Sequence, residues 1–393
     1  MGRRETLMSQ LRGEPPPADD GRNVDSLLGL LEGEGAAQQV ERLAEEHPHP
    51  PPSELHDSTS DLETYYGLPL LKEHVWKAAI PAYFYVGGLA GASAALGAAA
   101  TWSASPLLRG LVRKTRLIAT SGAMVSGALL IEDLGRPSRF FNMLRVFRPT
   151  SPMSIGSWLL AGFGALSTTA ALFRGRRAGP LAAIGDGAAV GAGVLGVPLA
   201  GYTAVLLSST AVPVWQGART WLPPLFMASA VTSAACVLDL CDLNALERRG
   251  VRRFGIAGKA AELVFSKAVE REVARPAILA APLRHGMSGA LWKGAKLLVA
   301  ASLALSLAPR ASPRLRRASA WLGTLGSVAL RFGILRAGRI SARDPRATFA
   351  QQRGGPVTAQ AGAPELVPDH AGPAASRDLA PASASEPSKV RAR

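Results

Sequence analysis

Apolar stretches of about 20 residues, separated by short polar connections, recur between Ala78 and Ile340. The stretch from Ala78 to Thr101, for example, contains no charged residue. A helix of about 20 apolar residues rises about 30 Å, which matches the thickness of the hydrocarbon core of a bilayer. The chain is therefore interpreted as a membrane protein, in which every polar side chain between the helices needs a physical reason.

Eight of these stretches predict helices joined by short loops, so the expected fold is an all-α polytopic membrane bundle of about eight transmembrane helices. The sixth stretch carries charges, but Lys259, Glu262 and Ser266 fall on one helical face together with Glu270. Such a stripe suits a spanning helix with its polar side inward, and it also suits an interfacial helix. The predicted helices cover residues 78–101, 115–133, 153–173, 184–208, 219–240, 254–273, 287–308 and 316–337.

Small residues are expected to bring these helices close together. Gly87 with Gly91, and Gly187 with Gly191, have the GxxxG spacing. This spacing lets two backbones approach in a membrane, where lipid gives no hydrophobic drive for association. We interpret these glycines as structural.

Composition separates the bundle from both ends of the chain. Residues 1–64 are rich in Pro, Glu, Asp and Ser, and residues 351–393 are rich in Ala, Pro and Ser. These compositions are typical of disordered tails, although the amphipathic stretch from Val24 to Ala44 is compatible with a short helix. We expect a polar N-terminal extension, a transmembrane domain over residues 65–350 and a C-terminal tail.

Charge and metal-ligating residues exclude several classes of function. The formal net charge of +15 comes mostly from Arg in the short connections, where lipid phosphates and topology explain it. We therefore expect no nucleic-acid partner. The two cysteines, Cys236 and Cys241, cannot complete a four-ligand metal site, and the six histidines all lie outside the apolar stretches. We expect neither haem nor metal in this chain.

The distribution of Arg and Lys predicts the orientation in the membrane. The odd-numbered connections between helices hold fifteen of these residues and the even-numbered connections hold seven. The positive-inside rule then places the odd-numbered connections in the cytoplasm and both termini outside.

The connection between helices two and three is the most informative loop. Gly135 and Pro137 break helix two, and from Arg136 to Arg148 polar residues recur at every third position, with aromatic and aliphatic residues between them. This pattern predicts an amphipathic helix lying in the membrane interface. Ser151 and Pro152 then predict the N-cap and first residue of helix three, whose positive dipole end faces the same side.

At these residues the chain resembles the NrfD/PsrC family of integral-membrane, quinone-interacting subunits of polysulfide-reductase-type complexes. The resemblance covers roughly residues 65–350 and ends near SARDP at 341–345. The family pattern usually reads GYTG where this chain has Ala204 after GYT. The motifs that carry the resemblance lie at Tyr66–Pro69, Tyr83–Gly91, Asp133–Pro137, Arg148–Ser154, Gly156–Trp158 and Gly201–Thr203, followed by Val205–Leu207.

The resemblance implies a function that the chain performs only within a complex. Such a subunit holds no redox metal, binds quinone or quinol (menaquinone or ubiquinone) near the outer face of the bacterial cytoplasmic membrane, and anchors the complex. It exchanges electrons with a ferredoxin-like iron–sulfur subunit and, through it, with a catalytic subunit, for which a molybdopterin enzyme is one option. A multi-helix transporter and a passive membrane anchor without a redox role remain as alternatives.

The resemblance and the residue chemistry together nominate a quinone site. Tyr202, one turn after Pro198, is the first candidate as a hydrogen-bond donor to a quinone carbonyl, and the alternative is a tyrosine anchored at the interface. Asp133 and Arg136 are expected to orient the loop or relay protons, unless they are only a helix-end acid and a loop arginine. His74 is a further candidate for quinone contact, although a Trp–Lys belt before helix one explains that segment too.

Three further ionisable residues are candidates for a proton path. Glu132 points about 100° away from Asp133 on a helix and is an equally good proton carrier. Glu262 and Arg331 lie deeper in predicted membrane helices. Because an ionisable residue in such a helix usually faces the bundle interior and has a partner, we predict that these two residues form a pair.

Overall fold

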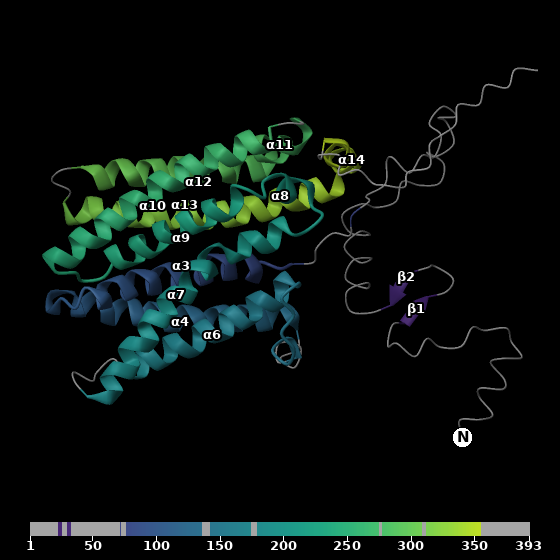
Figure 1. The fold of residues 1–393 in the computed structure, drawn as a ribbon. Helices are drawn as coiled ribbons and strands as arrows, with labels where there is room; N and C mark the ends of the chain where they lie inside the picture. The colour runs from purple at the N-terminus through teal and green to yellow at the C-terminus, as the bar shows by residue number, and fades with distance from the viewer. Residues whose placement is uncertain are drawn as a thin grey trace, which may run out of the picture. The chain divides into compact units, whose positions relative to one another are not determined.

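Eight long helices form a bundle in the computed structural model of the chain (Figure 1). Each lies where an apolar stretch predicts it, although several extend beyond the predicted ends. The structure describes residues 23–25, 30–32, 71, 76–135, 142–173, 179–274, 277–308 and 312–354. The long helices are α3 (Ala79–Trp102), α4 (Arg109–Leu134), α6 (Pro152–Leu172), α7 (Pro180–Ser208), α9 (Leu222–Asp239), α10 (Ala245–Glu272), α12 (Gly286–Leu307) and α13 (Pro313–Arg343).

Short elements accompany the long helices. They are η3 (Pro106–Leu108), α8 (Pro213–Gly217), α11 (Ala277–Arg284) and α14 (Pro345–Gly354). Nearer the N-terminus, β1 (Asn23–Asp25) pairs antiparallel with β2 (Leu30–Glu32), and Val24 lies opposite Leu31. The amphipathic pattern from Val24 to Ala44 is compatible with a helix, but the described residues of this stretch are strands. Gly29 directly precedes β2, and glycine is a poor helix former.

Seven of the long helices, all except α10, are long and apolar enough to cross a membrane. Large apolar side chains also cover the outside of the bundle. Met124, Leu172, Val194 and Leu297 are 69%, 75%, 66% and 71% exposed. Side chains of this kind on an outer surface suit contact with lipid rather than water. The chain is a multi-pass membrane protein.

Contacts between helix ends define two ends of the bundle, which we call proximal and distal. At the proximal end, where α3 begins, the backbone N–H of Lys77 donates to Asp133 Oδ1 at 3.2 Å and so joins the start of α3 to the end of α4. The end of α13 lies there too, because the Arg339 guanidinium donates to the carbonyl of Trp76. The distal end holds the start of α4, the end of α9 and the start of α10. Both ends of the eight-helix bundle therefore emerge at its proximal end.

The charged helix α10 runs the whole length of the bundle. At the distal end its capping residue Glu247 accepts a hydrogen bond from Leu111 N at 2.5 Å, where α4 begins. Near the proximal end Glu270 accepts one from Trp292 Nε1 at 2.8 Å, close to the start of α12. A helix of 28 residues rises about 42 Å, which is enough to connect these two points. We conclude that α10 lies beside the other helices and not across one face of them.

The polar stripe of α10 faces the bundle interior, as the sequence pattern allows. Lys259, Glu262 and Ser266 are each only 1% exposed, whereas Val264, between them in sequence, is 64% exposed. The amphipathic character of this helix is therefore inverted relative to a water-soluble protein. Its apolar side is outward and its charges lie inside.

Two glycines allow the backbones of α3 and α7 to touch. A Cβ atom on Gly91 would collide with the carbonyl oxygen of Gly196, and a Cβ on Gly196 would collide with the carbonyl oxygen of Gly91. The expected packing role of Gly91 is confirmed, and its partner is Gly196. The expectation for Gly187 is wrong, because no atom lies within 4 Å of the position its Cβ would take.

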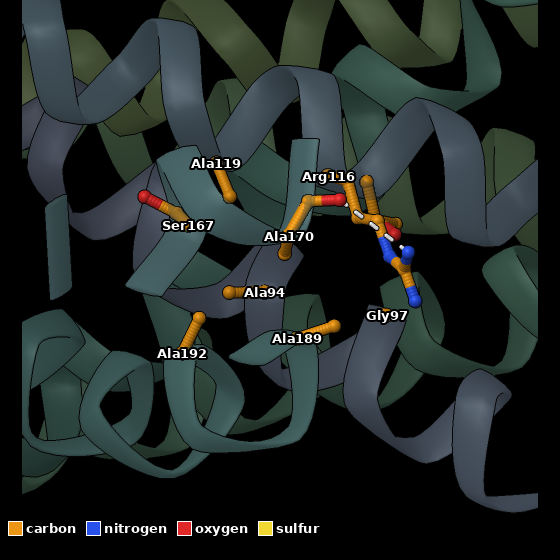
Figure 2. Close-up of a pocket in the computed structure, with 9 residues that line it drawn as sticks. Ala94, Gly97, Arg116, Ala119, Ser167, Ala170, Ala189 and Ala192 are labelled. Atoms are coloured by element: carbon orange, nitrogen blue, oxygen red, sulfur yellow. Dashed lines mark hydrogen bonds between the residues drawn. The ribbon is translucent and has the colours of Figure 1, made fainter. Parts of the chain in front are cut away.

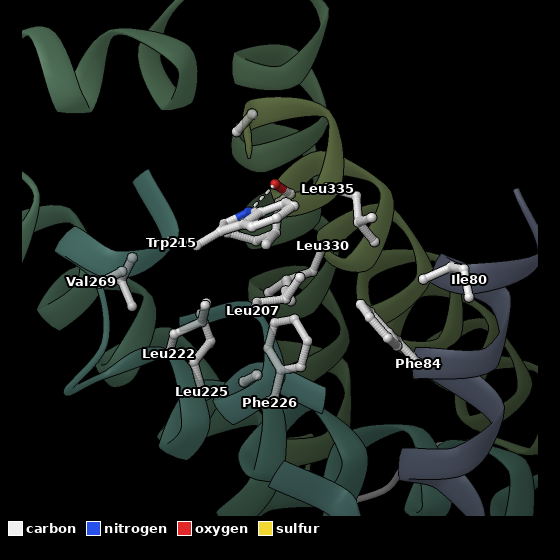
Figure 3. Packing of buried hydrophobic residues seen from close by; sticks show 14 of the residues in the cluster. Ile80, Phe84, Leu207, Trp215, Leu222, Leu225, Phe226, Val269, Leu330 and Leu335 are labelled. Atoms are coloured by element: carbon white, nitrogen blue, oxygen red, sulfur yellow. Dashed lines mark hydrogen bonds between the residues drawn. The ribbon is translucent and has the colours of Figure 1, made fainter. Parts of the chain in front are cut away.

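An apolar cluster fills the proximal half of the bundle between α7, α8, α9 and α13 (Figure 3). Its largest member, Trp215 of α8, is fully buried and donates from Nε1 to the carbonyl of Ile334 at 2.9 Å. The indole stacks on Trp76, with ring centroids 5.8 Å apart and an interplanar angle of 16°. Phe84 of α3 and Phe226 of α9 belong to the same cluster, with ring centroids 6.3 Å apart. Aromatic packing of this kind holds the segment before α3 against the ends of α8 and α13.

The predicted interfacial helix over residues 136–148 is not observed in its described part. Only residues 142–143 are helical there, and the chain continues to residue 150 through turns, a bend and two residues without regular structure. Pro149 accounts only for Arg148, because the residue before a proline is disfavoured in the helical region. The predicted start of the next helix is confirmed, since the Ser151 side chain caps α6 by accepting from Ser154 N.

Candidate functional site

Tyr202 lies near the proximal end of α7 and is buried against the first turn of α6. Its hydroxyl donates a hydrogen bond to the carbonyl of Pro152. Its ring fills the space beside Gly156, where any Cβ atom would collide with it. Pro198 lies inside α7 one turn earlier, and the helix continues through it. The tyrosine therefore joins two helices at the point where α6 begins, and its one hydroxyl hydrogen is already engaged.

A second tyrosine accompanies it from α3. Tyr83 is 3% exposed and lies close enough to Tyr202 for the two phenols to interact electrostatically. Within the described part of the chain, no hydrogen bond joins the Tyr83 hydroxyl to another residue, so this largely buried residue has a donor with free capacity. Sequence reasoning did not single out Tyr83, although its side chain lies in the YFYVGGLAG motif that contributes to the family resemblance.

Asp133 lies at the same end of the bundle, but in a different setting. Its carboxylate accepts the N–H of Lys77 and so fixes the segment before α3 to the end of α4, where Gly135 ends the helix with a φ of 70°. Between described residues, no hydrogen bond or ion pair joins Asp133 to Tyr202. Glu132 is exposed beside it. The candidates Arg136 and His74 lie outside the described residues.

A layer of buried charge lies deeper, where α9, α10 and α13 meet. Glu262 and Arg331 are each 1% exposed and interact electrostatically, yet no ion pair within 4.0 Å joins them in the described part of the chain. Both Glu262 carboxylate oxygens lack a hydrogen bond, although Ser229 and Thr232 of α9 are their neighbours. The two predicted partners are therefore opposite charges held at longer range than a contact ion pair.

Arg331 is held mainly through α9. Its Nη2 donates to the carbonyl of Phe226 at 3.0 Å, and its guanidinium lies 4.0 Å from the centre of the Phe226 ring. Its Nε and Nη1 have no hydrogen-bond partner. A buried polar atom without a hydrogen-bond partner costs free energy of folding. Such atoms in native proteins are usually explained by a bound water or by a functional role.

Lys259 continues the buried charge toward the distal end. Its ammonium donates to Ser306 Oγ at 2.8 Å and to Ser319 Oγ at 3.2 Å. These serines contact each other at 2.9 Å, and Ser302 Oγ donates to the Ser319 carbonyl at 2.7 Å. Serine signals no such cluster in a sequence, because it is also a common packing residue of membrane helices.

A small cavity lies between α3, α4, α6 and α7 in the distal half (Figure 2). It measures about 10 Å³, which is room for about one water. Arg116 lies along it, and its guanidinium donates to Asp186 Oδ1 at 2.5 Å and to the Ala170 carbonyl at 3.4 Å. The other lining residues are mostly alanines, so we interpret this cavity as a packing feature with a structural ion pair at its edge.

The buried polar side chains described here are chiefly tyrosine, serine and single charges. Within the described ranges, no group of three or more His, Cys, Asp or Glu side chains could hold a metal ion. Hydroxyl and guanidinium groups are donors, and the Glu262 carboxylate is a potential proton acceptor. The arrangement therefore offers hydrogen bonding and proton transfer.

Comparison with known proteins identifies the family. The family described as "Polysulphide reductase, NrfD" matches residues 69–341 of the chain. No curated protein matches the sequence. The matched region begins before α3 and ends within the last turn of α13, so it contains both the paired tyrosines and the buried charges. The chain therefore belongs to the polysulphide reductase NrfD family.

Proposed function

We propose that this chain is the quinone-interacting membrane subunit of an oxidoreductase complex in a bacterial cytoplasmic membrane. The observation that carries the proposal is the family match over residues 69–341, because the family as a whole supplies membrane subunits to quinone-interacting complexes. In this proposal a ferredoxin-like iron–sulfur subunit docks at the proximal end, on the outer side of the membrane. Electrons pass through that subunit to or from a catalytic subunit, and this chain anchors the assembly.

The proposed quinone site lies at the paired tyrosines. A quinone carbonyl accepts a hydrogen bond and a quinol hydroxyl donates one. The free hydroxyl of Tyr83 is suited to donate to a quinone carbonyl. The Tyr202 hydroxyl already donates to the Pro152 carbonyl, so its oxygen is suited to accept from a quinol hydroxyl. In this assignment Tyr202 also keeps α6 and α7 in register. Asp133, together with Arg136 and His74, is proposed to border the site at the membrane surface.

The buried charges are proposed to carry protons for this chemistry. Reduction of a quinone to quinol consumes two protons for two electrons, and oxidation releases them. Glu262 has no fixed hydrogen-bond donor on either carboxylate oxygen, so it is free to accept and release a proton. Glu132, exposed at the proximal end, is the proposed exchange point with water.

Binding of a fluorescent quinol analogue, a hydroxyquinoline N-oxide, to the purified full-length chain tests the proposed site. The Tyr83→Phe variant removes the free donor, and we expect it to weaken analogue binding about tenfold, the equivalent of about 1.4 kcal/mol for one buried hydrogen bond. Tyr202→Phe should weaken binding less, because its hydroxyl hydrogen is already used, but it should lower thermal stability by about 1 kcal/mol.

Tyr85→Phe is the matched control, since the Tyr85 phenol lies on the other face of α3, near Ser233 and Thr324. It should bind the analogue as well as the unmodified chain does. Analogue binding that is equal in all four proteins would discard the tyrosine site. No binding at all, even by the unmodified chain, would favour a passive anchor, and substrate flux through vesicles containing the chain alone would favour a transporter.

A further inference from the structure

A cavity of about 250 Å³ lies at the proximal end, where α10 ends and where α11 and α12 begin. It is distinct from the tyrosine site, because it is lined by α10, α11 and α12 and not by α3, α6 or α7. Its lining contains both apolar and charged side chains. The lining residues are Glu270, Val273, Ala280, Leu283, Arg284, Trp292, Lys293 and Lys296.

The positive charge of this cavity exceeds its negative charge. The one carboxylate among the described lining residues, Glu270, is already neutralised by an ion pair with Lys296 and by a second with Lys267 at 3.1 Å. Arg284 and Lys293 have no such partner, since within the described part of the chain neither has a carboxylate within 4.0 Å. Two cationic groups at one cavity therefore lack counter-ions.

The cavity wall is held in place by hydrogen bonds. Trp292 is 1% exposed and donates from Nε1 to Glu270 at 2.8 Å, which fixes α12 to α10. The Lys293 ammonium donates to the carbonyl of Arg284 at 2.8 Å and keeps two further hydrogens available. The Lys293 ammonium, which would meet an anion, is thus positioned before it arrives, a condition that lowers the entropic cost of binding.

One face of α12 continues from the cavity along the outside of the bundle. Lys293 lies on the exposed face of this helix, which is otherwise apolar. Leu297, one turn further from the proximal end, is 71% exposed, and Leu307 at the distal end is 55% exposed. In a bilayer, the phosphate of a lipid lies at the end of its acyl chains. Lys293 likewise lies at the end of an apolar, lipid-facing stripe, so it is placed to meet a lipid phosphate.

We propose that this cavity binds the phosphate of an anionic lipid, with the acyl chains along the exposed face of α12. Arg284 and Lys293 contact the phosphate, and the apolar side chains of Val273 and Leu283 contact the glycerol end of the lipid. An inorganic phosphate ion offers the same charge without the chains, so the two sources differ in a testable way. The lipid would hold α10, α11 and α12 together at the proximal end.

Native mass spectrometry of the delipidated full chain, titrated with phosphatidylglycerol, tests the proposal. The double variant Arg284→Gln/Lys293→Gln should bind this lipid about 25-fold more weakly, since each basic residue near a membrane surface contributes about fivefold. The matched control is Arg314→Gln/Arg317→Gln, which removes two exposed arginines at the distal end of α13 and should leave binding unchanged. Lys293→Arg, which keeps the charge, should also retain binding.

Three outcomes would overturn the proposal. Equal affinity for phosphatidylcholine would show that charge is not recognised. Equal loss of binding in the distal control would show that the effect is not local to the cavity. Displacement of phosphatidylglycerol by inorganic phosphate at equal concentration would assign the cavity to the free ion, because the acyl chains would then contribute nothing.

Discussion

At the scale of single residues, substitutions of Glu262 and Arg331 can measure how much two buried opposite charges stabilise the fold without direct contact. Arg331→Met leaves the Glu262 carboxylate buried with no hydrogen bond and no nearby Arg. Loss of one partner of a buried pair costs about 3–5 kcal/mol, and we expect unfolding of the detergent-solubilised protein to be easier by an amount in that range. Glu262→Gln, which removes the opposite charge, should be less harmful in the Arg331→Met background than alone.

A double-mutant cycle on unfolding free energies measures this coupling. We expect an interaction of at least about 1 kcal/mol between the two substitutions. Arg336→Met provides the control, because Arg336 lies on the same helix but is exposed. Its effect should simply add to that of Glu262→Gln. Additive effects for Arg331→Met as well would mean that the two buried charges act independently, and the proposed path would lose its central element.

The residue scale is also where sequence reasoning reached its limit. The polar stripe that contains Glu262 suits a spanning helix with its polar side inward, but it also suits an interfacial helix, and the burial of Glu262 decides between them. Sequence reasoning could not find what Tyr202 contacts, because the partner is the backbone carbonyl of Pro152. Every residue has such a carbonyl, so no sequence pattern identifies which one receives a hydrogen bond.

At the scale of elements, the crossing of α3 and α7 depends on two glycines that face each other. Gly91→Ala would place a methyl group on the Gly196 carbonyl, so the two backbones would have to separate. Overpacking of this kind costs about 1–3 kcal/mol, and the thermal midpoint of the purified protein should fall.

Gly187→Ala is the control for this prediction. Nothing lies within 4 Å of its Cβ position, so the substitution should be neutral or slightly stabilising through improved helix propensity, which is worth up to about 1 kcal/mol. Equal destabilisation by both changes would show that the effect comes from the loss of glycine itself and not from the crossing.

Helix boundaries were predictable only where hydropathy sets them. The start of α10 was expected at residue 254, but the helix begins at Ala245. The intervening run of arginines is not apolar, and the helix is started instead by a capping box in which Asn244 accepts from Glu247 N and Glu247 accepts from Asn244 N. This signal is local and polar. A search for apolar stretches cannot detect it.

At the scale of the whole molecule, the all-α bundle and its helix order follow from the sequence, because a bilayer accepts few alternatives to helices that satisfy their own backbone hydrogen bonds. The proximity of α10 and α12 at the proximal end does not follow in the same way. It depends on Glu270 accepting from Trp292 across a connection of unpredicted shape. The helices that the bilayer requires can thus be predicted from the sequence. The specific contacts between distant segments, such as that between Glu270 and Trp292, cannot.

Orientation is the whole-molecule property on which the proposed partner docking depends, and two positions can report on it. Cys241 is a native thiol in the connection between α9 and α10, at the distal end, whereas Ser209 is exposed after α7 at the proximal end. Burial raises the pKa of the Cys241 thiol, and this outweighs the opposing effect of the Lys114 ammonium. Its reactive thiolate becomes more abundant as the pH rises, so labelling is best compared near pH 8.5, about the ordinary pKa of a free thiol.

In right-side-out membrane vesicles, an impermeant maleimide should label Ser209→Cys in a Cys241→Ser background. It should label native Cys241 only after the vesicles are opened, because the distal connections carry the larger share of arginines and are therefore expected to face the cytoplasm. The buried Cys236 serves as an internal control that should stay unlabelled in both states. The reverse pattern would put the tyrosine end inside the cell, where an iron–sulfur partner would have to be a cytoplasmic protein.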